Sequence, residues 1–468
     1  MIASKPPQAK NEALQIPGAF RATSQDKMNW ASRAICDQQL HIVIQFDSLL
    51  DMEVLRRAIR LSLDAEPILG CLFVPKEYRS LWLRREDLDG LVNVTLSQTD
   101  DLQRALLDFI ARPSDPAIDP LIEVAVFRGE KDLLCVKVDH VVSDAGGARD
   151  YGYLLASIYT ALSRDYDFSP AINHLEKRGM MPVWSSFSMK QQLHFIQIGL
   201  RFSFVQEKFK TKWSIPGAKW GDKGATMLVR TLDRPTFQAI RSYAKQKGVT
   251  INDVVLTAFF RSMFRMIQPT IEVEVPIQVS VDLRRYLPPG SLDCITNLSS
   301  GLFPQMARKE GQGFGESLSE IKTKIDAFKA SDAAAVGIFF MGLKYRVTSL
   351  NKARREILEG VKKGTLNGVA RPLLSNIGTI ESARLKFGDN APMHAYITTP
   401  IAFSPFIILG VTSFDESMTF TLGYCQEGMQ RAEMETLLNT LVQELLTEVR
   451  LIRHPTTPRS SLEKSPAK

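Results

Sequence analysis

The chain has 468 residues, which favours two domains over one, and its 44% hydrophobic and 23% charged residues are typical of a folded globular protein. The formal net charge of +7 could favour anionic partners such as phosphorylated cofactors or lipid headgroups. A dense basic stripe with interleaved aromatic residues is missing, which argues against a nucleic-acid-binding protein.

The cysteines and the N-terminus bear on the cellular compartment. Five cysteines are scattered along the chain without a CxxC pair, which argues against a disulfide framework and structural zinc and suits a reducing compartment. The N-terminal stretch lacks the apolar core of a signal peptide, and no run of about 18 apolar residues predicts a membrane span. We therefore expect a cytoplasmic protein, with peripheral membrane contact as an alternative.

The first half of the chain alternates between predicted strands and helices. Residues 1–15 are polar and expected to be loose, and residues 16–181 form the first predicted domain. The apolar periodicity predicts strands at 41–46 and 68–74, a helix over 49–67 that Pro67 ends, a hairpin of strands 121–127 and 132–139, and a helix over 148–166.

Residues 182–225 differ in composition, because aromatic residues alternate there with lysines. We interpret this segment as the inter-domain connection. Its helical part is expected to pack its apolar face on the protein. The alternative is an interfacial helix that rests on a membrane or admits an apolar substrate.

The second half, residues 226–453, repeats the alternation, and a polar tail at 454–468 is expected to be disordered. Two strand-helix alternations in succession predict an α/β fold built of two α+β sandwiches. The expected elements are a strand at 226–233, a helix at 234–248 capped by Gly248, a helix capped by Thr250 or Asn252, a long strand at 271–288 that ends in a basic turn, apolar segments at 295–304, 368–380 and 406–425, and a final helix at 429–449.

The stretch Val136–Gly147, "VKVDHVVSDAGG", places a histidine where an apolar strand ends and a glycine-containing turn leads into a helix. At a strand end the sheet holds the backbone while the side chain can face a cleft. The imidazole of His140 could accept a proton at neutral pH, and Gly146 and Gly147 allow close backbone approach. The spacing alone leaves a structural histidine equally possible.

Other signatures are missing from the sequence. It contains no GxSxG, HExxH, GxxxxGK[ST] or strand-linked GxGxxG motif, so serine-hydrolase, zinc-protease and nucleotide-binding functions lose support. No set of ligands has the spacing of a metal site. We expect no metal and no permanently bound cofactor.

At this motif the chain resembles the condensation-domain-like, or CoA-dependent, acyltransferase superfamily, whose signature is His-His-x-x-x-Asp-Gly. Here the segment 139–145 reads Asp-His-Val-Val-Ser-Asp-Ala, so His140 and Asp144 match while Asp139 and Ala145 depart from the pattern. Softer similarities follow in the expected order over residues 25–450, among them "AEPILGCLF", "GVTINDVVLTAFF", "VSVDLRRYLP", "ITNLSSGLFP" and "PLLSNIGTI".

The resemblance implies two chloramphenicol-acetyltransferase-like halves, arranged as a V around a central tunnel with His140 midway. It implies that Asp144 pairs with an arginine of the second half, Arg284 or else its neighbour Arg285, instead of orienting the histidine. A buried carboxylate does need a paired cation. The alternative is that Arg284 and Arg285 are ordinary solvated charges on the surface.

The implied reaction is direct acyl transfer from acyl-CoA or acyl-phosphopantetheine to a hydroxyl or amine, with His140 as general base. The oxyanion could be stabilised by backbone N–H groups near Gly146 or by Asn297, and Asn376 is a further possible substrate contact. Both asparagines could instead be turn residues. Two alternatives stay open: a condensation enzyme served by an acyl carrier protein, and a non-catalytic binding relative. A monomer is expected.

Overall fold

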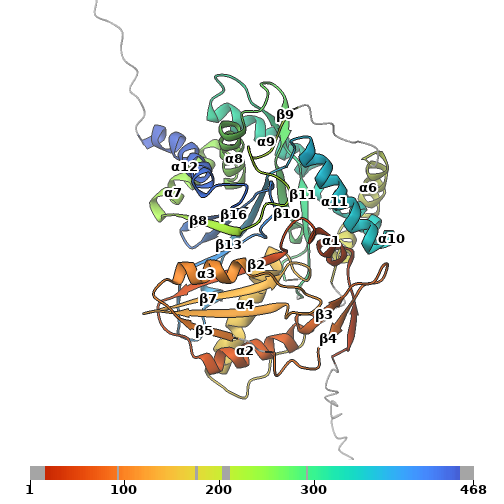
Figure 1. Cartoon of the computed structure of the whole chain (residues 1–468), viewed down its shortest axis with the longest axis vertical. Coiled ribbons are helices and arrows are strands. Elements are labelled where there is room, and N and C mark those ends of the chain that lie inside the picture. The colour runs from red at the N-terminus through yellow and green to blue at the C-terminus, as the bar shows by residue number, and fades with distance from the viewer. Residues whose placement is uncertain (1–15, 92–93, 174–177, 203–210, 291–293, 454–468) are drawn as a thin grey trace, which may run out of the picture.

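The computed structural model describes residues 16–91, 94–173, 178–202, 211–290 and 294–453. The predicted loose N-terminus and disordered tail lie outside these residues. The chain folds into two layered α/β halves that stack on each other along the long axis of the molecule (Figure 1). No helix within the described ranges is both long and apolar enough to cross a membrane.

The first half is built on a five-stranded sheet with strand order β14-β2-β7-β6-β5. Helices α2 and α4 cover one face and contribute to its hydrophobic core, while α3 covers the other face. The elements are β2 (Gln39–Phe46), α2 (Met52–Ala65), β5 (Val94–Gln98), α3 (Leu102–Ala111), β6 (Ile122–Arg128), β7 (Asp132–Asp139) and α4 (Ala145–Leu162), with β1 (Ala19–Arg21), β3 (Cys71–Val74) and β4 (Leu81–Arg84) in a separate three-stranded sheet.

The second half is built on a six-stranded sheet with order β11-β10-β13-β15-β16-β8, packed against α7, α8 and α12. The predicted caps are present, because Gly248 ends α7 with φ of 64° and Thr250 forms a capping box at the start of α8. The elements are β8 (Ala225–Leu232), α7 (Arg234–Lys247), α8 (Ile251–Ile267), β10 (Gln278–Asp282), β11 (Ser299–Leu302), α9 (Phe314–Ala330), β13 (Leu373–Ile380), β15 (Ile408–Phe414), β16 (Ser417–Cys425) and α12 (Arg431–Arg453).

The single long strand predicted at 271–288 is wrong. The segment forms β9 (Glu274–Pro276), which pairs with β12 (Gln305–Ala307), and then β10, which pairs with β11 and β13. Pro276 ends β9 and has no N–H for a further ladder bond, so the two short strands join different sheets. The basic turn is a short 3-10 helix, Leu283–Tyr286, capped by the Asp282 side chain.

Several elements had no sequence prediction. Helix α1 (Ser24–Ser32) packs between the halves and against α10 and α11, and strand β14 (Pro392–Ile397), although part of the second half of the chain, pairs with β2 of the first sheet. The connection between the halves contains α5 (Met181–Ser185) and α6 (Met189–Phe202), of which α6 is the helix expected in this segment. Helices α10 (Ala333–Val347) and α11 (Leu350–Leu366), which had no prediction, lie on the same side of the molecule (Figure 1).

Candidate active site

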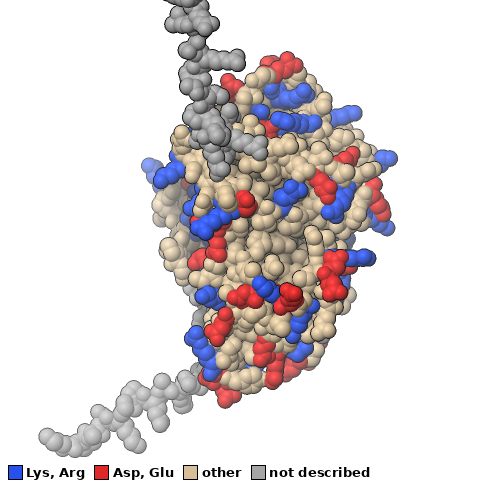
Figure 2. All heavy atoms as spheres, turned by 90° about the vertical axis from the view of Figure 1, so that its left-hand side faces the viewer, with Lys and Arg blue, Asp and Glu red and all other residues tan. Residues whose placement is uncertain are grey.

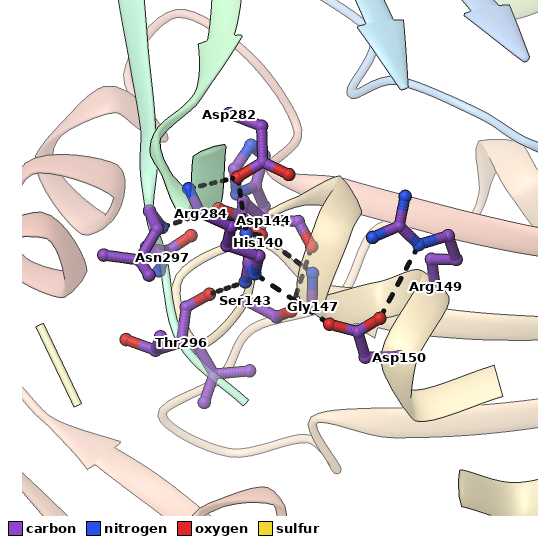
Figure 3. Close-up of polar contacts among 12 residues, drawn as sticks. His140, Ser143, Asp144, Gly147, Arg149, Asp150, Asp282, Arg284, Thr296 and Asn297 are labelled. Atoms are coloured by element: carbon purple, nitrogen blue, oxygen red, sulfur yellow. Dashed lines mark hydrogen bonds and ion pairs between the residues drawn. The ribbon is translucent and has the colours of Figure 1, made fainter. Parts of the chain in front are cut away.

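His140 lies in the turn between the end of β7 and the start of α4, facing residues of the second half (Figure 3). Its backbone N–H donates to the Gln38 carbonyl at 2.8 Å, which ties the turn to the start of β2. The ring is half-buried. The predicted strand-end placement of this histidine is therefore what the structure has.

Two asparagines hold the His140 turn. Nδ2 of Asn29 donates to the His140 carbonyl at 2.8 Å and to Oδ1 of Asn297 at 3.1 Å, and it lies 3.3 Å from Nδ1 of the ring. Nδ2 of Asn297 donates to the Val141 carbonyl at 2.9 Å and to a carboxylate oxygen of Asp26 at 3.3 Å. These acceptors fix the orientation of both amides.

The surroundings of His140 favour the neutral ring. Burial lowers the pKa of His140, although the nearby Asp144 carboxylate and hydrogen bonds to the backbone of His140 and Ser143 and to the Asn297 side chain act in the opposite direction. With its pKa below the ordinary value of about 6.5, the ring is neutral at pH 7 and can accept a proton.

Both carboxylate oxygens of Asp144 are bound by groups other than the His140 ring. One oxygen accepts from the Gly147 N–H at 2.8 Å as the N-cap of α4, and the other accepts from the Leu298 N–H at 2.5 Å. Oδ1 also lies 2.9 Å from Nη1 of Arg284, so the ion pair predicted between these two residues is present. Burial alone would raise the pKa of Asp144, but Arg284 and the two N–H donors outweigh it, and the pKa lies below its ordinary value.

Arg284 connects this cap to the second half (Figure 3). Its Nη2 donates to the Thr296 carbonyl at 3.0 Å, and its Nη1 lies 3.2 Å from Oδ1 of Asp282. Burial opposes the charge on Arg284, but the carboxylates of Asp144, Asp282 and Asp150 raise its pKa above the ordinary value. The guanidinium therefore stays charged.

The glycines of the motif permit this close approach. A Cβ on Gly146 would lie 2.7 Å from Nη1 of Arg284, and one on Gly147 would lie 2.5 Å from Oγ of Ser143 and 3.2 Å from the Thr296 carbonyl. Ala145, by contrast, is partly exposed at the first position of α4, where its methyl group packs at the edge of the first core. The departure at Ala145 thus falls where a side chain fits.

Asp139, the other departure from the motif, is a buried carboxylate. It accepts from the Val141 N–H at 2.8 Å and lies 3.8 Å from Nη1 of Arg33. Burial raises the pKa of Asp139 to about 7, with the Val141 bond and Arg33 acting against it. This side chain ties Val141 of the turn to the end of β7.

A network of buried ion pairs and hydrogen bonds that supports the His140 turn was not predicted from the sequence. Asp26, fully buried in α1, pairs with Arg178 at 3.2 Å and accepts from the indole N–H of Trp82 at 2.9 Å. Arg178 also donates to the Val142 carbonyl at 3.1 Å. The capping box of Thr23 and Asp26 is visible as a local pattern, but nothing local signals the contacts of Asp26 with Arg178 and Asn297.

Asn376, the remaining residue predicted to contact substrate, is bonded to residues outside the His140 turn. Asn376 lies in β13, accepts from the Gly378 N–H at 3.0 Å and donates to Asn252 at 3.3 Å, which is the turn-residue alternative. No group of histidine, cysteine and acidic residues that could hold a metal occurs within the described residues. Two cavities lie at α2 and β6 and between α8 and α12, and His140 lines neither.

Comparisons with known proteins place the fold. No family model and no curated protein matches the chain by sequence. Among solved structures, it is similar to the trichothecene 15-O-acetyltransferase of Fusarium sporotrichioides, with a TM-score of 0.66, 13% identity and coverage of 92% of this chain and 95% of that one.

Two further structures are similar over nearly their full lengths. The first condensation domain of the calcium-dependent antibiotic synthetase has a TM-score of 0.66 and 17% identity, with coverage of 92% and 96%. Polyketide synthase associated protein 5 of Mycobacterium tuberculosis has a TM-score of 0.64 and 14% identity, with coverage of 92% and 99%. The chain therefore has the predicted two-part α/β fold, the one shared by condensation domains and this acetyltransferase.

Proposed function

We propose that the protein is an acyltransferase that moves an acyl group from a thioester to a hydroxyl or amine, with His140 as general base. The observation that carries the proposal is the division of roles at the turn. Asp144 is bound to Arg284 and two backbone donors, while His140 stays half-buried, with burial holding it neutral. A histidine held in this way is suited to accept and return one proton.

The amide contacts indicate which ring nitrogen would act. Nδ2 of Asn29 has two hydrogens, and its two shorter contacts, to the His140 carbonyl and to Asn297, use both. Although burial lowers the pKa of His140, the acceptors beside the ring, the backbone of His140 itself and the Asn297 side chain, act to raise it, which favours Nδ1 as the nitrogen that carries the hydrogen. Nε2 would carry the lone pair that accepts the proton.

The reaction would proceed without a covalent enzyme intermediate. Nε2 takes the proton of the acceptor O–H or N–H as that atom attacks the thioester carbonyl carbon. The tetrahedral intermediate then breaks its C–S bond, and the leaving thiolate takes the proton back from the imidazolium. Because the Asn297 amide hydrogens are bound to Val141 and Asp26, we assign Asn297 to positioning the turn instead of stabilising the oxyanion.

The donor is proposed to be acyl-CoA, with an acyl carrier protein as the alternative donor. The acetyltransferase neighbour is named for an O-acetyl transfer and the condensation-domain neighbour belongs to an antibiotic synthetase, so the fold accommodates both kinds of chemistry. A central tunnel reaching His140 is part of the proposal.

A thiol-release assay tests the function. The full chain is incubated with acyl-CoAs of increasing chain length, each with and without a panel of alcohols and amines, and free CoA is detected by its thiol. Acceptor-dependent release with matching ester or amide formation supports the proposal. If no donor, CoA-bound or carrier-bound, gives acceptor-dependent release, the non-catalytic alternative takes its place.

A further inference from the structure

Helices α6 and α10 lie on one side of the molecule and are flanked by α11 (Figure 1). They carry exposed apolar side chains, and the three helices together contain an excess of positive charge. We propose that this side, the α6–α10 surface, binds an anionic lipid bilayer without crossing it. The inference does not depend on the proposed acyl transfer.

Helix α6 has two apolar faces, and only one of them is covered. Phe195 is buried in a small core that also contains Val183 and Ile338. Met189, Leu193 and Ile196 are 79%, 59% and 40% exposed, and their i, i+4, i+7 spacing places them along one stripe. Among the described residues, no side chain has to move before a partner can contact these three residues.

Helix α10, which packs against α6, adds further exposed apolar side chains, with Leu343 and Val347 on one face and Met341 on another. Ile338 and Tyr345 are buried, while Met341, Leu343 and Val347 are exposed, Val347 by 74%. The exposed residues of α10 also include Lys344. Exposed leucine, methionine and valine on neighbouring helices form the kind of apolar patch that marks an interaction site.

The charge of these helices decides which partner fits. The sequences of α6, α10 and α11 contain nine lysines and arginines but only two glutamates, an excess of seven, which equals the +7 of the whole chain. The rest of the chain is therefore balanced, as Figure 2 illustrates on the side away from α6 and α10, where both signs are interspersed. Within α6 and α10 no acidic residue occurs at all.

The exposed apolar side chains of α6 and α10 are bordered by an excess of cations, although Lys344 is paired with Glu356 of α11 at 2.9 Å. This combination matches an anionic bilayer. The apolar stripe can enter the headgroup region while the cations contact anionic headgroups. A second copy of the chain would place two positive surfaces against each other, which argues against self-association.

The surface is one helix away from His140. Nζ of Lys27 in α1 donates to the Tyr345 carbonyl of α10 at 2.7 Å, and Asn29, two residues further along α1, binds the His140 carbonyl. If the proposed function holds, a bilayer at this surface would bring a lipophilic acceptor or acyl chain close to the candidate active site.

Vesicle co-sedimentation of the full chain, without substrates, tests the inference. Vesicles of phosphatidylcholine alone are compared with vesicles that also contain phosphatidylglycerol, at low and high salt. We expect binding that requires phosphatidylglycerol and weakens with salt. The variant Leu193→Glu with Ile196→Glu should bind roughly tenfold or more weakly, because two apolar contacts are lost and two negative charges are added.

The control variants distinguish vesicle binding by the α6–α10 surface from nonspecific apolar binding and from any effect of the candidate active site. Ile118→Glu, at a site 70% exposed in the first half, should leave binding unchanged, and so should His140→Ala. Lys190→Gln with Arg346→Gln should weaken binding by about tenfold or more and flatten its salt dependence. The inference is overturned if neither kind of vesicle is bound, if neutral vesicles bind equally well, or if the α6 variant binds like the wild type. A dimer in sedimentation velocity that Leu193→Glu disperses would also overturn it, in favour of self-association.

Discussion

Asp144 and Arg284 lie 140 positions apart in the chain, yet their side chains meet at 2.9 Å. Asp144 caps the helix that follows the His140 turn, and Arg284 belongs to the 3-10 helix that follows β10 of the second half. The pair therefore fixes the His140 turn against the opposite half of the molecule.

Removing one member of this pair should be costly. Asp144→Ala leaves the Arg284 guanidinium buried with the N–H groups of Gly147 and Leu298 unpaired, and we expect a loss of about 3–5 kcal/mol in the free energy of unfolding. Denaturant unfolding measures it. The matched control is Asp282→Ala, which removes a more exposed carboxylate from the same guanidinium and should cost about 1 kcal/mol. Equal losses in the two variants would show that the buried pair has no special role.

The glycines of the motif should respond unequally to added methyl groups. Gly147→Ala places a Cβ against the Ser143 hydroxyl and the Thr296 carbonyl, and we expect a loss of about 1–3 kcal/mol with a matching fall in melting temperature. Ala145→Gly, the change toward the family motif, should shift stability by less than about 1 kcal/mol and should not raise activity. An Ala145→Gly variant with strongly increased turnover would mean that the alanine impairs the site.

The pH profile of turnover should report the lowered pKa of His140. The neutral ring is the active form, so kcat/KM should rise with pH through a midpoint below about 6.5 and stay level from there to pH 8. Initial rates of thiol release across pH 5–9, with a check that the fold persists at each end, measure this. An acidic limb with its midpoint above 7 would contradict the assignment of burial as the main influence on the ring.

Asp139 should make the fold less stable as the pH rises. Its pKa is about 7 in the folded protein, against about 4 in an unfolded chain, so the folded state holds the extra proton between these values. Stability from this group is complete below pH 4 and is lost as the pH rises through 7. Asp139→Asn keeps the acceptor for the Val141 N–H, and should raise the free energy of unfolding at pH 8 by about 1–3 kcal/mol relative to its effect at pH 5. Chemical denaturation at the two pH values would contradict this if the difference were absent or reversed.

Local patterns predicted the parts of the fold and the site that depend on neighbouring residues. The β6–β7 hairpin, the α8 cap at Thr250 and the strand-end position of His140 are all present. The partnership of Asp144 with Arg284 came from the family resemblance, since no spacing rule connects residues so far apart. The α/β fold class, by contrast, was predicted correctly from the alternation of strands and helices as well as from the resemblance.

Other features depend on contacts that a single sequence does not display. Asn29 reaches His140 across 111 positions, and Arg178 reaches Asp26 across 152, without any motif that pairs them. The break between β9 and β10 follows from pairing with separate strands, and β14 pairs with β2 far back in the chain. Helix α10 carries apolar residues on nearly every side, so its periodicity is a weak signal for a packed face.

The central claim, that His140 moves the proton, is tested most directly by His140→Ala under single-turnover conditions with the best donor and acceptor pair. Loss of a general base should lower the rate of acceptor-dependent thiol release by about 10²–10⁴-fold while the melting temperature changes little. His194→Ala, which removes an exposed histidine of α6, should react like the wild type. Undiminished thiol release in a folded His140→Ala protein would contradict the account.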